Sequence, residues 1–166
     1  MVAYALVGRA QFVLGTGFAV PTQVVLVPML LLLPTPTVPL LVAVALVLTT
    51  MMDALRGRAS SERAVSAVAD AWFAVAPALV LVVCDAQTPD WSDWPVYVTA
   101  FVAQIALDSA ITAFRVWACL GESPREILGE LRACHRVDCL LAPAGLLAAF
   151  ALSLIHILTL PTNREV

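Results

Sequence analysis

The stretch FAVPTQVVLVPMLLLLPTPTVPLLVAVAL, residues 18–46, contains five prolines and one glutamine but no charged residue. So apolar a segment is typical of a buried helix or a membrane span, yet proline inside a helix removes a backbone donor and kinks or breaks it. In lipid, every backbone polar group needs a partner within the protein. The stretch therefore suits a place where neighbouring helices cover it or where it lines a cavity. A helix broken at membrane depth, as at transporter binding sites, is one interpretation; a plain proline-kinked helix of a bundle is the other, which we favour.

The whole chain of 166 residues shares this apolar character. Hydrophobic residues make up 61% of it and charged residues 13%, and its mean hydropathy is +0.94. Soluble domains are about 45–50% apolar and about 25% charged, because polar groups must cover their surface. The class that fits is an integral membrane protein. No basic patch with interleaved aromatic residues is present, which argues against nucleic-acid binding.

Four apolar segments are long enough for a helix to cross a bilayer, which takes about 20 residues. They are residues 38–55, 65–84, 96–120 and 137–158. Ahead of them we expect two shorter helices, 2–14 and 21–33, joined by a Gly-rich bend, with Pro21 in a first helical turn. Whether residues 1–33 cross the membrane once or twice stays open. The predicted fold class is all-α: a polytopic transmembrane helical bundle with a proline-broken segment near the N-terminus.

The distribution of arginine predicts the orientation, because cytoplasmic loops are enriched in Lys and Arg. The connections 56–64 and 121–136 each carry three arginines, whereas 85–95 has three aspartates, two tryptophans and no basic residue. We therefore expect a multi-pass protein of the inner (cytoplasmic) membrane, with the first two connections in the cytoplasm and the third outside. A short surface helix is expected from Pro124. Asp138 would then begin the last span, where a carboxylate meets the positive end of the helix dipole.

The last residues differ in composition from the rest of the chain. The segment LSLIHILTLPTNREV, residues 152–166, holds two of the five isoleucines and the only asparagine. It resembles the peptide that translated sequencing-adapter DNA gives at the end of an assembled fragment. We therefore expect a membrane helical domain over residues 1–152 and a non-native tail over 153–166.

Polar side chains within the apolar segments are the candidate site residues, because ionisable groups in a membrane usually face a partner or a cavity. Helical spacing puts Gln104, Asp108 and Arg115 near one face of their segment. Asp108 and Arg115 are about 10 Å apart along the axis at 1.5 Å per residue, too far for a direct ion pair. Each therefore seeks a partner on another helix: Asp70 is one candidate for Arg115, and Arg9 is one candidate for Asp108.

Two interpretations of these residues stay open. They form either a polar pocket for a small ligand or a proton, or interhelical hydrogen bonds that contribute about 0.6–2 kcal/mol each. The full set of candidates is Arg9, Gln23, Asp70, Gln104, Asp108 and Arg115.

Other chemistry finds little support in the sequence. The segment CHRVDC, residues 134–139, lacks the close cysteine pair and the second ligand pair that a zinc site needs. No nucleophile with a neighbouring base and no Gly-rich phosphate loop is found. We expect no enzymatic activity, no metal and no cofactor.

Several motifs resemble the N-terminal membrane module of actinobacterial signalling proteins. An arginine-containing helix and a Gly-rich turn are followed by VPTQ (20–23), VPML (27–30) and LLPTP (32–36). Later matches are RGR (56–58), DAW (70–72), WPVY (94–97) and LLAP (140–143). The similarity covers the chain from about Tyr4 to Phe150. Such modules precede HD-GYP or GGDEF output domains of cyclic di-GMP signalling, and neither motif occurs in this sequence.

The resemblance implies a sensory or anchoring module of a bacterial signalling protein, whose cytoplasmic output domain would follow in the intact gene after one more span. One alternative is a small-molecule transporter or substrate-binding membrane subunit, with Asp108 facing a cavity. Another is a structural membrane protein whose polar residues only pack helices. The expected partners are the lipid bilayer, a second copy in a homodimer and a small-molecule ligand, and no nucleic acid.

Overall fold

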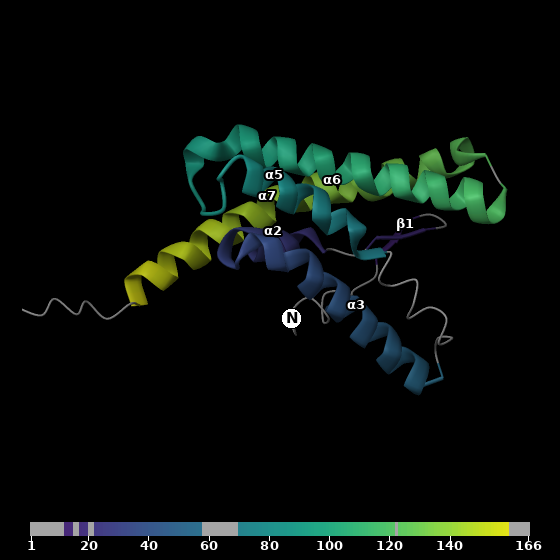
Figure 1. The fold of residues 1–166 in the computed structure, drawn as a ribbon, viewed down its shortest axis with the longest axis horizontal. Coiled ribbons are helices and arrows are strands. Elements are labelled where there is room, and N and C mark those ends of the chain that lie inside the picture. The colour runs from purple at the N-terminus through teal and green to yellow at the C-terminus, as the bar shows by residue number, and fades with distance from the viewer. Residues whose placement is uncertain (1–11, 15–16, 20–21, 58–69, 122, 160–166) are drawn as a thin grey trace, which may run out of the picture.

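The computed structural model of the protein describes residues 12–14, 17–19, 22–57, 70–121 and 123–159. Helices dominate these residues (Figure 1): α2 (Gln23–Leu32), α3 (Val38–Leu55), α5 (Val75–Val83), α6 (Trp94–Arg115) and α7 (Pro124–Thr159). Short 3-10 turns precede three of them: η1 (Thr35–Thr37), η2 (Ala71–Ala74) and η3 (Trp91–Asp93). A π-helical turn, η4 (Val116–Leu120), extends α6. The all-α class is confirmed.

The beginning of the described chain is extended. Strand β1 (Phe12–Leu14) pairs antiparallel with β2 (Gly17–Ala19), and Leu14 lies opposite Gly17. The helix predicted over 2–14 is therefore wrong for residues 12–14, while 1–11 lie outside the described residues. Phe and Val favour strands, and the Gly-Thr-Gly sequence favours a turn over a continuing helix.

The proline-rich stretch forms α2, η1 and the first turns of α3. Pro28 lies inside α2, and this helix ends just before Pro34 and Pro36, which have no N–H to donate. The Thr35 hydroxyl, which is fully buried, donates to the Leu30 carbonyl at 2.9 Å. A side chain thus satisfies a carbonyl at the end of α2 that the proline-rich turn leaves open.

α7 differs most from the prediction, because it runs unbroken over 36 residues. The predicted connection 121–136 with its separate surface helix is instead a tight turn followed by the first turns of α7. Gly121 has a φ of 67°, a left-handed conformation that glycine adopts without strain, and Pro124 fits a first helical turn. α7 also continues through residues 153–159, the described part of the expected tail.

Three helical segments are long and apolar enough to cross a membrane: Thr35–Leu55, Trp91–Ala118 and Leu131–His156. At most 17% of the residues in their apolar windows are buried inside the protein, so lipid is the environment that suits the remaining side chains. These segments mark the chain as a membrane protein. Ala71–Val83 is shorter; at 1.5 Å per residue it spans about 20 Å of a hydrocarbon core of about 30 Å. It represents the predicted 65–84 span, of which residues 65–69 lie outside the described part.

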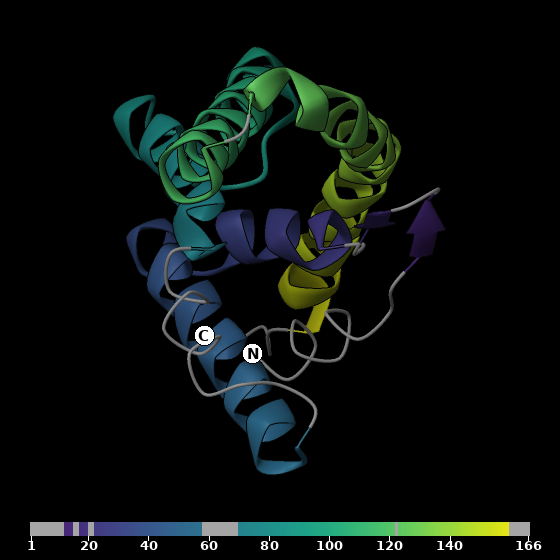
Figure 2. The ribbon, with the colours of Figure 1, turned by 90° about the vertical axis from the view of Figure 1, so that its right-hand side faces the viewer.

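The helices of the bundle pack in pairs. α5 lies along α6, α2 packs against α7, and α3 projects away from both pairs (Figures 1 and 2). Along α3, Leu40 and Leu55 are 67% and 86% exposed, whereas Val42 is fully buried. The core therefore lies between the two pairs and the first turns of α3.

A close approach of backbones holds α2 on α7. A Cβ atom at Gly145 would lie 2.6 Å from the Gln23 carbonyl oxygen and 3.1 Å from Val27 Cβ. Small residues at such positions let membrane helices come together without a side chain between them. Gly145 therefore sets the distance between these two helices.

Two side-chain contacts lie near the ends of α6, one from α6 itself and one from η3, which precedes it. Arg115 Nη1 donates to Asp70 Oδ1 just before η2, and their side chains are 45% and 50% exposed. Asp70 is the residue named as a candidate partner of Arg115 from the sequence. At the other end, Trp91 stacks on Phe150 of α7 with ring centroids 4.2 Å apart.

The α5–α6 connection is ordered by one tyrosine. The Tyr97 hydroxyl accepts from the Asp90 N–H at 2.9 Å, and the Thr88 and Asp90 carbonyl oxygens lie within its donating reach. The Asp90 carboxylate in turn accepts the Ser92 N–H at 2.9 Å, which lowers the pKa of Asp90 below its usual range. These bonds fix the chain where it enters α6.

Replacing Gly145 by alanine should separate α2 from α7. The added methyl group meets a backbone carbonyl, which cannot move by a rotamer change, so we expect a loss of about 1–3 kcal/mol in the free energy of unfolding. Gly129→Ala in the same helix is the matched control, because its Cβ would meet nothing within 4 Å and alanine is the better helix former by about 1 kcal/mol. Unfolding in detergent measures both variants. Equal stability of the two would contradict the close approach at Gly145.

The Asp70–Arg115 pair should contribute little to stability, because both side chains are about half exposed. A double-mutant cycle with Asp70→Asn, Arg115→Gln and the double variant should give a coupling energy of about 1 kcal/mol or less. Chemical unfolding of the four proteins measures it. A coupling energy of about 3 kcal/mol would show instead that the pair is shielded from solvent, as buried pairs are.

Candidate functional site

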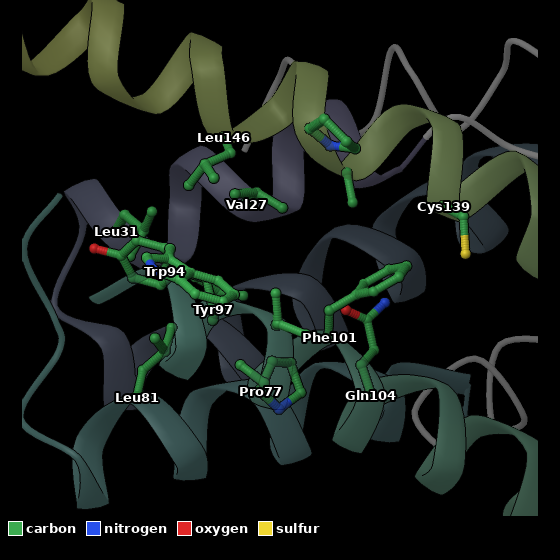
Figure 3. Close-up of a pocket in the computed structure, with 15 residues that line it drawn as sticks. Val27, Leu31, Pro77, Leu81, Trp94, Tyr97, Phe101, Gln104, Cys139 and Leu146 are labelled. Carbon is green, nitrogen blue, oxygen red and sulfur yellow. The ribbon is translucent and has the colours of Figure 1, made fainter. Parts of the chain in front are cut away.

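A cavity of about 350 Å³ lies between α2, α5, α6 and α7 (Figure 3). Its volume falls at the lower end of the range of about 300–1,000 Å³ that is typical of small-molecule sites. Its lining residues are Val27, Leu30 and Leu31 of α2, Pro77 and Leu81 of α5, Trp94, Tyr97, Val98, Ala100, Phe101 and Gln104 of α6, and Cys139, Ala142, Pro143 and Leu146 of α7.

The wall of this cavity is almost entirely apolar. The Tyr97 ring faces it, but the Tyr97 hydroxyl bonds to the α5–α6 connection. Gln104 brings an amide to the wall and is 7% exposed. Figure 3 shows Gln104 and Cys139 toward one end of the cavity, with Trp94 and Leu81 toward the other. The cavity therefore suits a mainly apolar molecule and has its polar side at the Gln104 end.

Polar side chains gather where α2, α6 and α7 meet, and we call Gln23, Asp108, Ser109, His135 and Asp138 the polar cluster. His135 Nε2 lies 3.0 Å from Ser109 Oγ, and His135 Nδ1 lies 3.9 Å from Asp138 Oδ2. The Gln23 side chain lies close enough to the Asp138 carboxyl group to interact with it. Asp108 interacts electrostatically with His135, Asp138 and Asp70. Three helices thus contribute to one network.

Two buried atoms of this network lack a hydrogen-bond partner among the described residues: Gln23 Oε1 and His135 Nδ1. Gln23 is only 1% exposed. A buried acceptor without a donor costs about 1–3 kcal/mol. The polar cluster therefore has capacity for a further donor.

The polar cluster and the cavity lie on the same faces of three helices. Residues four apart in a helix share a face. On each of the three helices, a residue that lines the cavity has a polar residue four positions away on the same face. These pairs are Val27 and Gln23 on α2, Gln104 and Asp108 on α6, and Cys139 and His135 on α7. The cluster therefore continues the cavity beyond its Gln104 end.

The structure brings together three of the residues that the sequence analysis selected, Gln23, Gln104 and Asp108. Asp70 and Arg115 pair with each other instead. Arg9, the expected partner of Asp108, lies outside the described residues.

The sequence analysis missed Ser109, His135 and Asp138. Asp138 does not begin a helix, because α7 begins at Pro124. Once that helix is extended upstream, the i, i+3 spacing of His135 and Asp138 puts both on one face. This spacing is the signal that could have found them.

In the part of the chain that the structure describes, no group of three or more His, Cys, Asp or Glu side chains is placed to hold a metal ion. No protein-family model, no curated protein and no solved structure matches this chain.

Proposed function

We propose that the chain is the sensory membrane module of a bacterial signalling protein and that it binds a small molecule in the cavity between α2, α5, α6 and α7. The cavity is the observation that carries this proposal. It measures about 350 Å³, opens to the surface of the bundle, and has the size and the largely apolar wall that are typical of small-molecule sites. A module that served only as an anchor would need membrane spans but no such space.

The orientation that suits this role is the one predicted from the arginines. The connection 56–64 and the α6–α7 turn lie in the cytoplasm, and the α5–α6 connection lies outside an inner membrane. In Figure 1, the end of α3 and the α6–α7 turn lie toward one end of the long axis, and the α5–α6 connection lies toward the other. This arrangement supports the proposed topology.

A ligand can act here only if it binds one arrangement of the helices better than another. The cavity is bounded by the α5–α6 pair on one side and by α2 with α7 on the other. Its occupant therefore contacts both pairs and favours a particular spacing between them. The resemblance to cyclic di-GMP signalling modules implies a catalytic output domain on the cytoplasmic side. The activity of that domain would respond to the spacing between the two helix pairs.

A transporter subunit is the second candidate, and one observation favours it. α2 is a ten-residue helix with Pro28 inside it, and it contributes to the cavity wall. Short broken helices beside a binding site are typical of transporters. The two functions differ in outcome, because a transporter moves its ligand across a sealed vesicle and a sensor only binds it.

Filling the cavity should abolish ligand binding. We expect 1-decanol to raise the unfolding temperature of the protein in lipid nanodiscs, since a ligand at 100 times its Kd stabilises the native state by about 2.7 kcal/mol. Ala142→Leu should remove this increase, because Ala142 lines the cavity, and Ala144→Leu should retain it, because Ala144 is exposed on the same helix. An unchanged unfolding temperature in the unmodified protein would refute the proposed ligand site.

Cysteine labelling should recover the proposed orientation. In a variant with all four native cysteines replaced by serine, Ser92→Cys should react with a membrane-impermeant maleimide in intact cells. Ser123→Cys should react only after the membrane is permeabilised, because the arginine-rich side stays in the cytoplasm. Labelling at position 123 in intact cells, with labelling at position 92 only after permeabilisation, would contradict the proposed orientation and a cytoplasmic output domain.

A further inference from the structure

We propose that the cavity and the polar cluster form one binding site for an amphiphile whose head group is a protonated amine. Its apolar body lies in the cavity, and its ammonium group lies among Gln23, Asp108 and Asp138. The inference rests on the proposed function, because it names the chemical class of the ligand for that cavity.

Continuity of the two regions is the first argument. Gln104 and Cys139 lie toward the same end of the cavity (Figure 3). One helical turn beyond them lie Asp108 and His135, which interact with each other. A molecule that fills the apolar cavity and extends past Gln104 therefore reaches the polar cluster without leaving the bundle.

The hydrogen-bonding groups in the cluster specify the head group. The Gln23 Oε1 atom is a buried acceptor that has no donor among the described residues, and the two carboxyl groups are acceptors when ionised. An ammonium group offers three donors and no acceptor. It can therefore satisfy Gln23 and still bond to a carboxylate, which a head group made of acceptors cannot do.

Charge favours the same head group. Among the described residues, Asp108, Asp138 and His135 interact electrostatically with one another, Asp108 also interacts with Asp70, and Cys139 brings a thiol to the same end of the cavity. Asp70 already has Arg115 as its ion-pair partner. When Asp108 and Asp138 are ionised, they supply the counter-charge that a cation in a membrane interior needs. A carboxylate or phosphate head group would be repelled.

The neighbouring cavity argues for an amphiphile over a simple cation. An inorganic ion or a short amine would occupy the polar cluster and leave about 350 Å³ of apolar space unfilled. Burial of an apolar body contributes about 0.8 kcal/mol per CH₂ group. The affinity for an amine should therefore increase with its chain length.

Three probes with the same chain test the head group: decylamine, 1-decanol and decanoate. Each is titrated against the full chain in nanodiscs, with empty nanodiscs as the correction for partition into lipid. We expect decylamine to bind about tenfold more tightly than 1-decanol, the effect of one charge-assisted hydrogen bond, and decanoate to bind most weakly. Ethylamine, the head group without the body, should show no measurable binding.

Variants then locate the head group. Gln23→Leu and Asp108→Asn should each lower the affinity for decylamine about tenfold and leave that for 1-decanol within about twofold. Asp53→Asn on α3 is the matched control and should change neither affinity. Because all variants are measured in the same lipid, the partition of each probe into that lipid is the same and does not affect the ratio of affinities between variants. If Gln23→Leu does not fold, Asp108→Asn decides alone.

The possible results separate this inference from the proposed function. Equal affinities for decylamine and 1-decanol, or a preference for decanoate, would overturn the amine head group and leave the cavity as a site for an apolar ligand. An unchanged affinity for decylamine in folded Gln23→Leu and Asp108→Asn variants would also overturn the amine head group. Failure of every probe to bind would overturn both proposals.

Discussion

The contact of α2 with α7 at Gly145 is the constraint on which the rest of the bundle depends. Because Gly145 has no side chain, the Gln23 carbonyl oxygen occupies the space that a Cβ atom would need. This contact brings the Gln23 side chain to Asp138 and turns the next residues of α2 toward the α5–α6 pair. The cavity and the polar cluster both follow from this one approach of two backbones.

The same region holds the features that weaken a fold. Side chains that line a cavity make fewer dispersion contacts with one another than side chains in a packed core, and buried polar atoms without a partner lose the hydrogen bonds they make in water. Both features lie between the same helices, whereas Tyr97 hydrogen-bonds the α5–α6 connection and Thr35 hydrogen-bonds the end of α2. A cavity next to buried polar atoms without a partner among the described residues is typical of a binding site, where local consistency gives way to function.

Much of the helical organisation could be predicted from residue type alone. The bounds of α3 match the prediction, because an apolar run between a proline and an arginine leaves little choice of where the helix begins and ends. The pairing of Asp70 with Arg115 follows from the rarity of charges, since each has few partners of opposite sign within reach. Residues 12–14 and the start of α7 were predicted wrongly, because glycines can end a helix or form a tight turn and short segments give few signals to choose between them.

The sequence by itself determined that the chain is helical and apolar enough to span a membrane, because that property depends only on the number and order of apolar residues. It also selected Gln23, Gln104 and Asp108 as unusual polar residues in apolar segments. Only the tertiary structure decided that these three meet Ser109, His135 and Asp138 at one end of a cavity. The reason is physical: which faces of three helices meet is set by contacts between residues far apart in the chain, above all the close packing of Gln23 on Gly145.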